Sequence, residues 1–154
     1  MHLETIRGLL IFFIIALIAS GITAIPIDTE LKFLIGHTDQ KSFVNYWFRK
    51  VLLAYRDTKI QYPFLLYGYD WLAFAHFILA ILFIGPLKNP VKNIWVVEFG
   101  MIACVLVFPL ALVARHFRGI PPGWRLIDCS FGLAGIIPLW ICRIKISKLD
   151  KWKN

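Results

Sequence analysis

The stretch IWVVEFGMIACVLVFPLALVA occupies residues 94–114, and Glu98 is its only charged side chain. An apolar helix of this length can cross about 30 Å of hydrocarbon. Outward from it, residues 8–27 carry no charge, and residues 71–87 contain a single ionisable side chain, His76. The sequence therefore predicts at least three membrane-spanning helices.

A fourth span is expected over residues 126–145. Its uncharged part, residues 129–142, is short, so the helix must also include Asp128 and Arg143 near its ends. Hydrophobic residues make up 59% of the 154 positions, against the 45–50% usual for soluble domains, and the mean hydropathy is +0.71. We expect an all-α integral membrane protein, with one four-helix transmembrane domain over residues 1–154.

The long connection between the first two spans, residues 28–70, has the composition of ordered amphipathic helices. Asp28 is expected to cap a short helix that ends at Gly36. A second helix over residues 42–56 has an apolar stripe of Val44, Phe48, Val51, Leu52 and Tyr55, and an opposite polar face of Ser42, Asn45, Arg49 and Arg56. This pattern is typical of a helix in the membrane interface or over the mouth of the bundle, and packing on the bundle without a lipid role is the alternative.

Basic residues near the span ends predict the orientation. The net charge is +8, and the basic side chains of the short second turn and of the tail are Lys88, Lys92, Arg143, Lys145, Lys148, Lys151 and Lys153. By the positive-inside rule we expect both termini in the cytoplasm, in a bacterial inner membrane with its lipids as partners. The sequence contains no aromatic-basic module that would indicate nucleic-acid binding.

Three cysteines, Cys104, Cys129 and Cys142, fall within the predicted spans, and no two are in a Cys-x-x-Cys arrangement. A membrane disulfide oxidoreductase needs a close redox pair at an accessible helix end. The sequence therefore argues against that class of enzyme, and we expect these thiols to be packing residues.

Helical spacing predicts on which helix face, and at which depth in the membrane, each polar residue lies. Tyr69 and His76 share a stripe of the second span, two turns apart, and we expect them in its outer half with Asp70. Asp128 belongs to the outer end of the fourth span, next to arginines of the third turn, Arg115 and Arg125. The sequence therefore predicts an outer polar pocket that contains His76, Asp70, Asp128 and these arginines.

Glu98 is expected near the opposite face, because it begins the third span. On the same helix as Asp128, Gly132 and Gly135 allow a neighbouring backbone to approach closely. Structural roles are alternatives for each ionisable group. His76 would donate to a backbone carbonyl or a tyrosine on an adjacent helix, Asp128 would pair with Arg125 or Arg115, and Glu98 would extend to the headgroups beside Lys92.

The order of parts resembles the EXPERA superfamily, which includes the sigma-2 receptor and a sterol isomerase. The matching features are Asp28 after the first span, Tyr55-Arg56-Asp57 late in the connection, His76 in the second span, Pro109 in the third, and Pro138 before a basic tail. The chain is also similar to small bacterial four-span proteins, and that similarity implies no activity. In the isomerases a glutamate follows the histidine by four residues, where this chain has Ala80.

The resemblance implies a cavity that takes a lipophilic ligand, often cationic or similar to a lipid, isoprenoid or sterol. The candidate ligand-binding residues are Asp28, Asp57, Tyr69, Asp70, His76, Glu98 and Asp128. Any reaction would be a proton-shuttling isomerisation with His76 as general acid or base, and Ala80 removes one of the carboxylates expected to carry protons.

Two other classes of function stay open. One is electron transfer through a quinone, or through a haem held by His76 and His116, although we expect no cofactor and no metal. His116 lies beyond the apolar run, which disfavours paired axial ligation. The other is an accessory subunit without a ligand, whose polar residues bind a helix of a second copy or of another subunit.

Overall fold

The computed structural model describes residues 2–151, and within them the side chains of all residues except His2, Arg115, His116, Asp150 and Lys151. These residues form helices and turns, with no strand among them. Four helical segments are long and apolar enough to cross a membrane, namely Leu3–Thr23, Pro63–Lys88, Ile94–Ala114 and Pro122–Leu149. The all-α prediction is confirmed, and the chain is an integral, multi-pass membrane protein.

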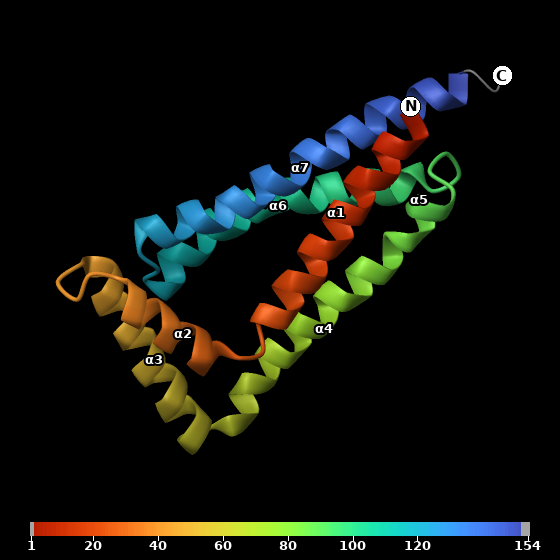
Figure 1. Cartoon of the computed structure of the whole chain (residues 1–154). Coiled ribbons are helices and arrows are strands. Elements are labelled where there is room, and N and C mark those ends of the chain that lie inside the picture. The colour runs from red at the N-terminus through yellow and green to blue at the C-terminus, as the bar shows by residue number, and fades with distance from the viewer. Residues whose placement is uncertain (1, 152–154) are drawn as a thin grey trace. The chain divides into compact units, whose positions relative to one another are not determined.

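Figure 1 shows the helices in chain order. They are α1 (His2–Thr23), α2 (Ile27–His37), α3 (Phe43–Gln61), the 3₁₀ helix η1 (Pro63–Leu66), α4 (Tyr67–Leu82), α5 (Ile84–Lys88), α6 (Ile94–Arg118) and α7 (Pro122–Lys151). The first span ends earlier than expected, at Thr23, because the residue before Pro26 is disfavoured in an α-helix. The second begins earlier, since Pro63 starts a 3₁₀ turn that leads into α4.

The chain divides into two compact units. The hairpin unit contains the described residues of Met1–Ile15 and Ala80–Asn154, and it includes α6 and α7. The connection unit is Ala16–Leu79, and it includes α2 and α3. Each is described by itself below.

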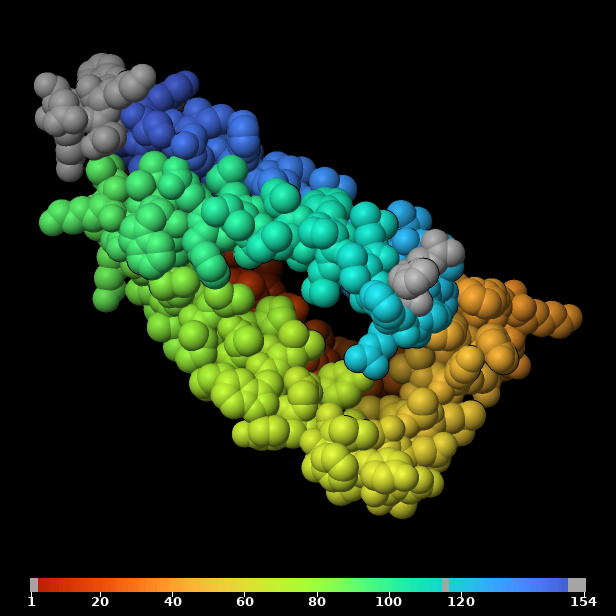
Figure 2. All heavy atoms as spheres, turned by 180° about the vertical axis from the view of Figure 1, so that it is seen from behind, coloured from red at the N-terminus to blue at the C-terminus, as the bar shows by residue number. Residues whose placement is uncertain are grey.

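In the hairpin unit, α6 packs along α7, and their atoms form one continuous surface in Figure 2. Gly119, with φ of 62°, reverses the chain between them in a left-handed conformation that glycine adopts without strain. A Cβ atom added to Gly132 would lie 2.8 Å from the Cys104 carbonyl oxygen, and one added to Gly135 would lie 2.7 Å from the Cys104 Sγ. The predicted close approach of a neighbouring backbone is confirmed at Gly132, whereas the close neighbour of Gly135 is a side chain.

The core of the hairpin unit also includes the first part of α1. Ile6 and Leu10 of α1 are fully buried, and the Cys142 Sγ lies 3.8 Å from the Ile6 carbonyl oxygen. The Phe13 and Phe83 rings pack with their centroids 4.7 Å apart. This part of the molecule is therefore held together mainly by apolar contacts between helices.

In the connection unit, α2 packs on α3 around a polar side chain, Asn45. The Asn45 Nδ2 group donates to the carbonyl oxygens of Ile35 and Thr38 and to the Thr38 hydroxyl, at 2.8, 3.2 and 2.9 Å. Carbonyl groups at a helix C-terminus have no partner within the helix, so Asn45 satisfies the end of α2. These bonds fix how α2 lies on α3.

The sequence-based assignment of faces on α3 is wrong at Asn45 and at Val44. Asn45 was expected on the polar face but is completely buried, whereas Val44 of the expected apolar stripe is 48% exposed. Phe48 and Leu52 are buried as predicted. The unpaired carbonyls at the end of α2 explain the difference, because an amide can bond them and a valine cannot.

The second part of α1 lies against α4 in the same unit. A Cβ atom added to Gly21 would lie 3.1 Å from the Ala73 carbonyl oxygen and 3.2 Å from the His76 Cβ. The absence of a side chain at Gly21 therefore permits the close contact that puts His76 beside α1.

Candidate functional site

A pocket of about 540 Å³ lies in the connection unit, at the end of α1 and between α2 and α3. It combines charged side chains with an apolar wall. Its lining residues are Ile25, Pro26, Asp28, Thr29, Lys32, Tyr55, Arg56, Lys59 and Ile60. This composition fits an amphiphilic molecule, with one polar and one apolar end.

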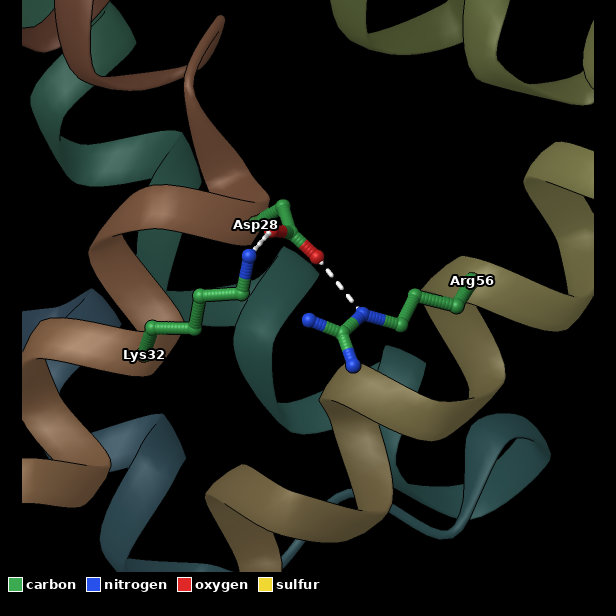
Figure 3. A network of polar contacts seen from close by, with 3 residues as sticks. All are labelled: Asp28, Lys32 and Arg56. Atoms are coloured by element: carbon green, nitrogen blue, oxygen red, sulfur yellow. Dashed lines mark hydrogen bonds and ion pairs between the residues drawn. The ribbon is translucent and has the colours of Figure 1, made fainter.

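Asp28 is the centre of an ion-pair network in this pocket (Figure 3). The Arg56 Nε atom donates to the Asp28 Oδ1 atom at 2.7 Å, and the Lys32 ammonium group forms an ion pair with Oδ2. The hydrogen bonds from Arg56 and Lys32 lower the pKa of Asp28 from its ordinary 3.8 to about 2. In return, the Asp28 carboxylate raises the pKa of Arg56. The network is therefore fully charged at neutral pH.

The expectation that Asp28 caps α2 is wrong. Pro26 is the N-cap residue, and no side chain bonds the first backbone N–H groups of the helix. Asp28 lies in the first turn, where its carboxylate turns toward Arg56 on α3. A hydrogen bond with a charged donor is stronger than a neutral one, which is consistent with the side chain bonding Arg56 rather than the backbone.

One further candidate residue, Tyr69, is connected to the pocket. The Tyr69 ring of α4 meets the ring of Tyr55, which lines the pocket, edge to face at a centroid distance of 6.3 Å. Asp57 and Asp70 are exposed and do not line the pocket. The structure thus brings Asp28 and Tyr69 to one region and leaves Asp57 and Asp70 at the surface.

His76 is half-buried on α4, and its Nδ1 atom lies 2.7 Å from the Leu72 carbonyl oxygen. A carbonyl oxygen only accepts hydrogen bonds, so Nδ1 is the donor in this contact. The expected structural alternative was a bond to an adjacent helix, whereas the bond observed lies within the helix of His76 itself. A catalytic role of His76 stays a prediction.

Glu98 belongs to the hairpin unit, where the Arg143 Nε atom donates to its Oε1 atom at 2.9 Å. The sequence-based alternative, in which Glu98 extends toward the headgroups beside Lys92, did not include Arg143 as its partner. The two residues are nearly equidistant along the chain from the turn at residues 119–121, so antiparallel helices place them side by side. That symmetry is a sequence signal that could have identified the pair.

Asp128 is half-buried on α7 and forms no ion pair with a described side chain. The alternative in which Asp128 pairs with Arg125 is therefore not observed, and the Arg125 Nε atom is buried with no hydrogen-bond partner in the part of the chain that the structure describes. Two residues of the sequence-based predictions, Arg115 of the outer cluster and His116 of the haem alternative, have side chains outside the described residues.

Among the described residues, no group of three or more histidine, cysteine or acidic side chains could hold a metal ion. Cys104, Cys129 and Cys142 are free thiols. Cys142 is buried against α1, and the half-buried Cys104 packs against α7, so both contribute to packing as expected.

Lys32 and Lys59 were missing from the sequence-based set of site residues. Lys32 follows Asp28 by four residues on one helix, a spacing that favours an ion pair and could have been recognised. No comparable signal identifies Lys59, because only the packing of α2 on α3 places the end of α3 beside Asp28.

Comparison with known proteins identified no relative of this chain. No protein-family model, no curated protein and no solved structure matches this chain.

Proposed function

We propose that this membrane protein binds a lipophilic ligand whose polar end occupies the pocket around Asp28 and Arg56. The observation that carries the proposal is the pocket itself, in which a charged network and apolar side chains share a volume of about 540 Å³. Apolar burial stabilises a bound chain by about 25 cal/mol per Å², and a few polar groups fix its orientation.

The position of the pocket along the chain supports a ligand that comes from the membrane. Ile25 and Pro26 follow the end of the first span, Thr23, and Ile60 precedes the start of the second, Pro63. Each helical residue advances the chain by only about 1.5 Å, so these lining residues remain close to the membrane surface. With cytoplasmic termini, as the basic flanks predict, the pocket opens at the outer face.

The test is native mass spectrometry of protein purified in a mild detergent. The wild type is expected to retain an amphiphile at one molecule per chain. Ile60→Asn is expected to lose it, because Ile60 supplies part of the apolar wall. Leu53→Asn is the matched control, since Leu53 is also an exposed apolar residue of α3 but does not line the pocket.

His76→Ala extends the same experiment to the candidate site on α4. Equal retention by Ile60→Asn and the wild type would overturn the pocket assignment. Loss of the ligand from His76→Ala with full retention by Ile60→Asn would place the ligand on α4 and overturn it as well.

A further inference from the structure

The charges that line the pocket are unequal in number. Lys32, Arg56 and Lys59 contribute three positive charges, and Asp28 contributes the single negative charge. Because its pKa is about 2, Asp28 is ionised at neutral pH and already has two cationic partners. The pocket thus has an excess of positive charge before any ligand enters.

The network leaves hydrogen-bond donors for a ligand. Arg56 uses its Nε–H group for Asp28, and Figure 3 shows both terminal amino groups of the guanidinium away from that bond. Lys59 pairs with no described acidic side chain. A guanidinium fork next to an ammonium group matches the geometry and charge of a phosphate.

Asp28 has a positioning role in this arrangement. By accepting from Arg56 Nε, it fixes the guanidinium between α2 and α3, so that less side-chain entropy is lost when a ligand binds. A cationic ligand would have to displace Lys32 or Arg56 from Asp28, or enter against the excess charge. The charge balance therefore disfavours the cationic ligands that the family resemblance implies.

The apolar rim places the donors next to the membrane. Ile60 is 80% exposed and Ile25 is 59% exposed, and both are close in sequence to a span end. Exposed apolar side chains beside basic groups are typical of surfaces that contact anionic lipids.

We propose that the polar end of the ligand is a phosphate group, bound by Arg56 and Lys59. This inference rests on the proposed function and adds the chemical class of the ligand. The phosphate could belong to a lipid headgroup or to a water-soluble anion, and the experiment separates these two sources.

The experiment measures binding to the detergent-solubilised protein by native mass spectrometry. The added ligands are phosphatidylglycerol, diacylglycerol, which has the same chains but no phosphate, a long-chain primary amine, and inorganic phosphate as a competitor. Phosphatidylglycerol is expected to bind more tightly than diacylglycerol and the amine. Displacement by inorganic phosphate would support the proposal with a soluble source, and lipid binding that resists it would support a headgroup.

Lys59→Gln is the decisive variant, because Lys59 makes no ion pair with a described side chain whose loss would disturb the fold. Its affinity for phosphatidylglycerol is expected to fall about fivefold. Lys50→Gln removes the same charge from the same helix outside the pocket, where the Lys50 Nζ atom lies 5.5 Å from the Trp47 ring centre, and its affinity is expected to stay within about twofold of the wild type.

The two proposals fail in different ways. If the wild type retains no amphiphile, the proposed function is wrong. If it retains one, but diacylglycerol or the amine binds as well as phosphatidylglycerol, or Lys59→Gln binds like the wild type, the phosphate assignment alone is wrong.

Discussion

The α6–α7 pair and the α2–α3 pair differ in the contacts that hold them together. The α6–α7 pair has close contacts with Cys104 at Gly132 and Gly135, and among the described side chains a single ion pair, Glu98–Arg143, joins its two helices. The α2–α3 pair is joined by the bonds of Asn45 and by the Asp28–Arg56 ion pair.

The difference follows from the solvent that surrounds each helix pair. In hydrocarbon, apolar burial gives little gain between helices, so close contact of small residues is the effective attraction. At the membrane boundary, contacts between loosely packed side chains compete with contacts to water. Charged side chains there form ion pairs without a large desolvation cost. The helix pair outside the spans is therefore where a charged binding site can form.

The largest expected effect concerns the hairpin. Gly132→Leu would place a side chain against the Cys104 carbonyl oxygen, a backbone atom that cannot move aside easily. We expect a loss of about 1–3 kcal/mol in the free energy of unfolding, measured by thermal unfolding in detergent.

Gly123→Ala is the control on the same helix, because a Cβ atom added there meets nothing within 4 Å. Its stability should stay within about 0.5 kcal/mol of the wild type. Equal stabilities of Gly132→Leu and Gly123→Ala would show that close packing does not hold this hairpin.

A comparable or somewhat smaller loss is expected when the polar connection is broken at Asn45. Asn45→Leu keeps the approximate size of the side chain but leaves the acceptors at Ile35 and Thr38 without their donor. The expected loss is about 1–2 kcal/mol in the free energy of unfolding. Val44→Ala, at the exposed neighbouring position, should change it much less. A neutral Asn45→Leu would mean that water replaces the amide.

The smallest expected effect is the pH dependence of the Asp28 network. The pKa of Asp28 is about 2 in the folded chain, against an ordinary 3.8, so the unfolded chain binds the proton more readily. The stability that the ion pairs contribute is present above about pH 4 and is lost as the pH falls through about 2. The network is partly exposed, which keeps its contribution small.

The measurement is the difference in thermal midpoint between the wild type and Asp28→Asn as a function of pH. The difference is expected to be constant above about pH 4 and to shrink between there and about pH 2. A difference that stays constant down to pH 2 would show that Asp28 does not carry this dependence. The hairpin variants should show no such change in this pH range.

Parts of the candidate site were accessible from the sequence. Asp28 was selected through the family resemblance, by its place after the first span, and the helix expected over residues 42–56 was recognised from its apolar stripe. The Ser42 Oγ atom does accept from the Asn45 N–H group at 3.1 Å, as an N-cap residue does. The charged residues of the pocket were not recognised as a group, because Arg56 is distant from Asp28 in sequence and Lys59 joins the same pocket only after α2 and α3 pack.

By itself the sequence determined the all-α class and the four apolar spans, because hydrocarbon requires long uncharged helices and leaves that requirement visible in composition. Only the tertiary structure decided which polar groups meet. It paired Glu98 with Arg143, buried Asn45 at the end of α2, and gathered Lys32, Arg56 and Lys59 around Asp28. Such pairings depend on helix rotation and register, and a change of one residue in register turns a side chain by about 100°.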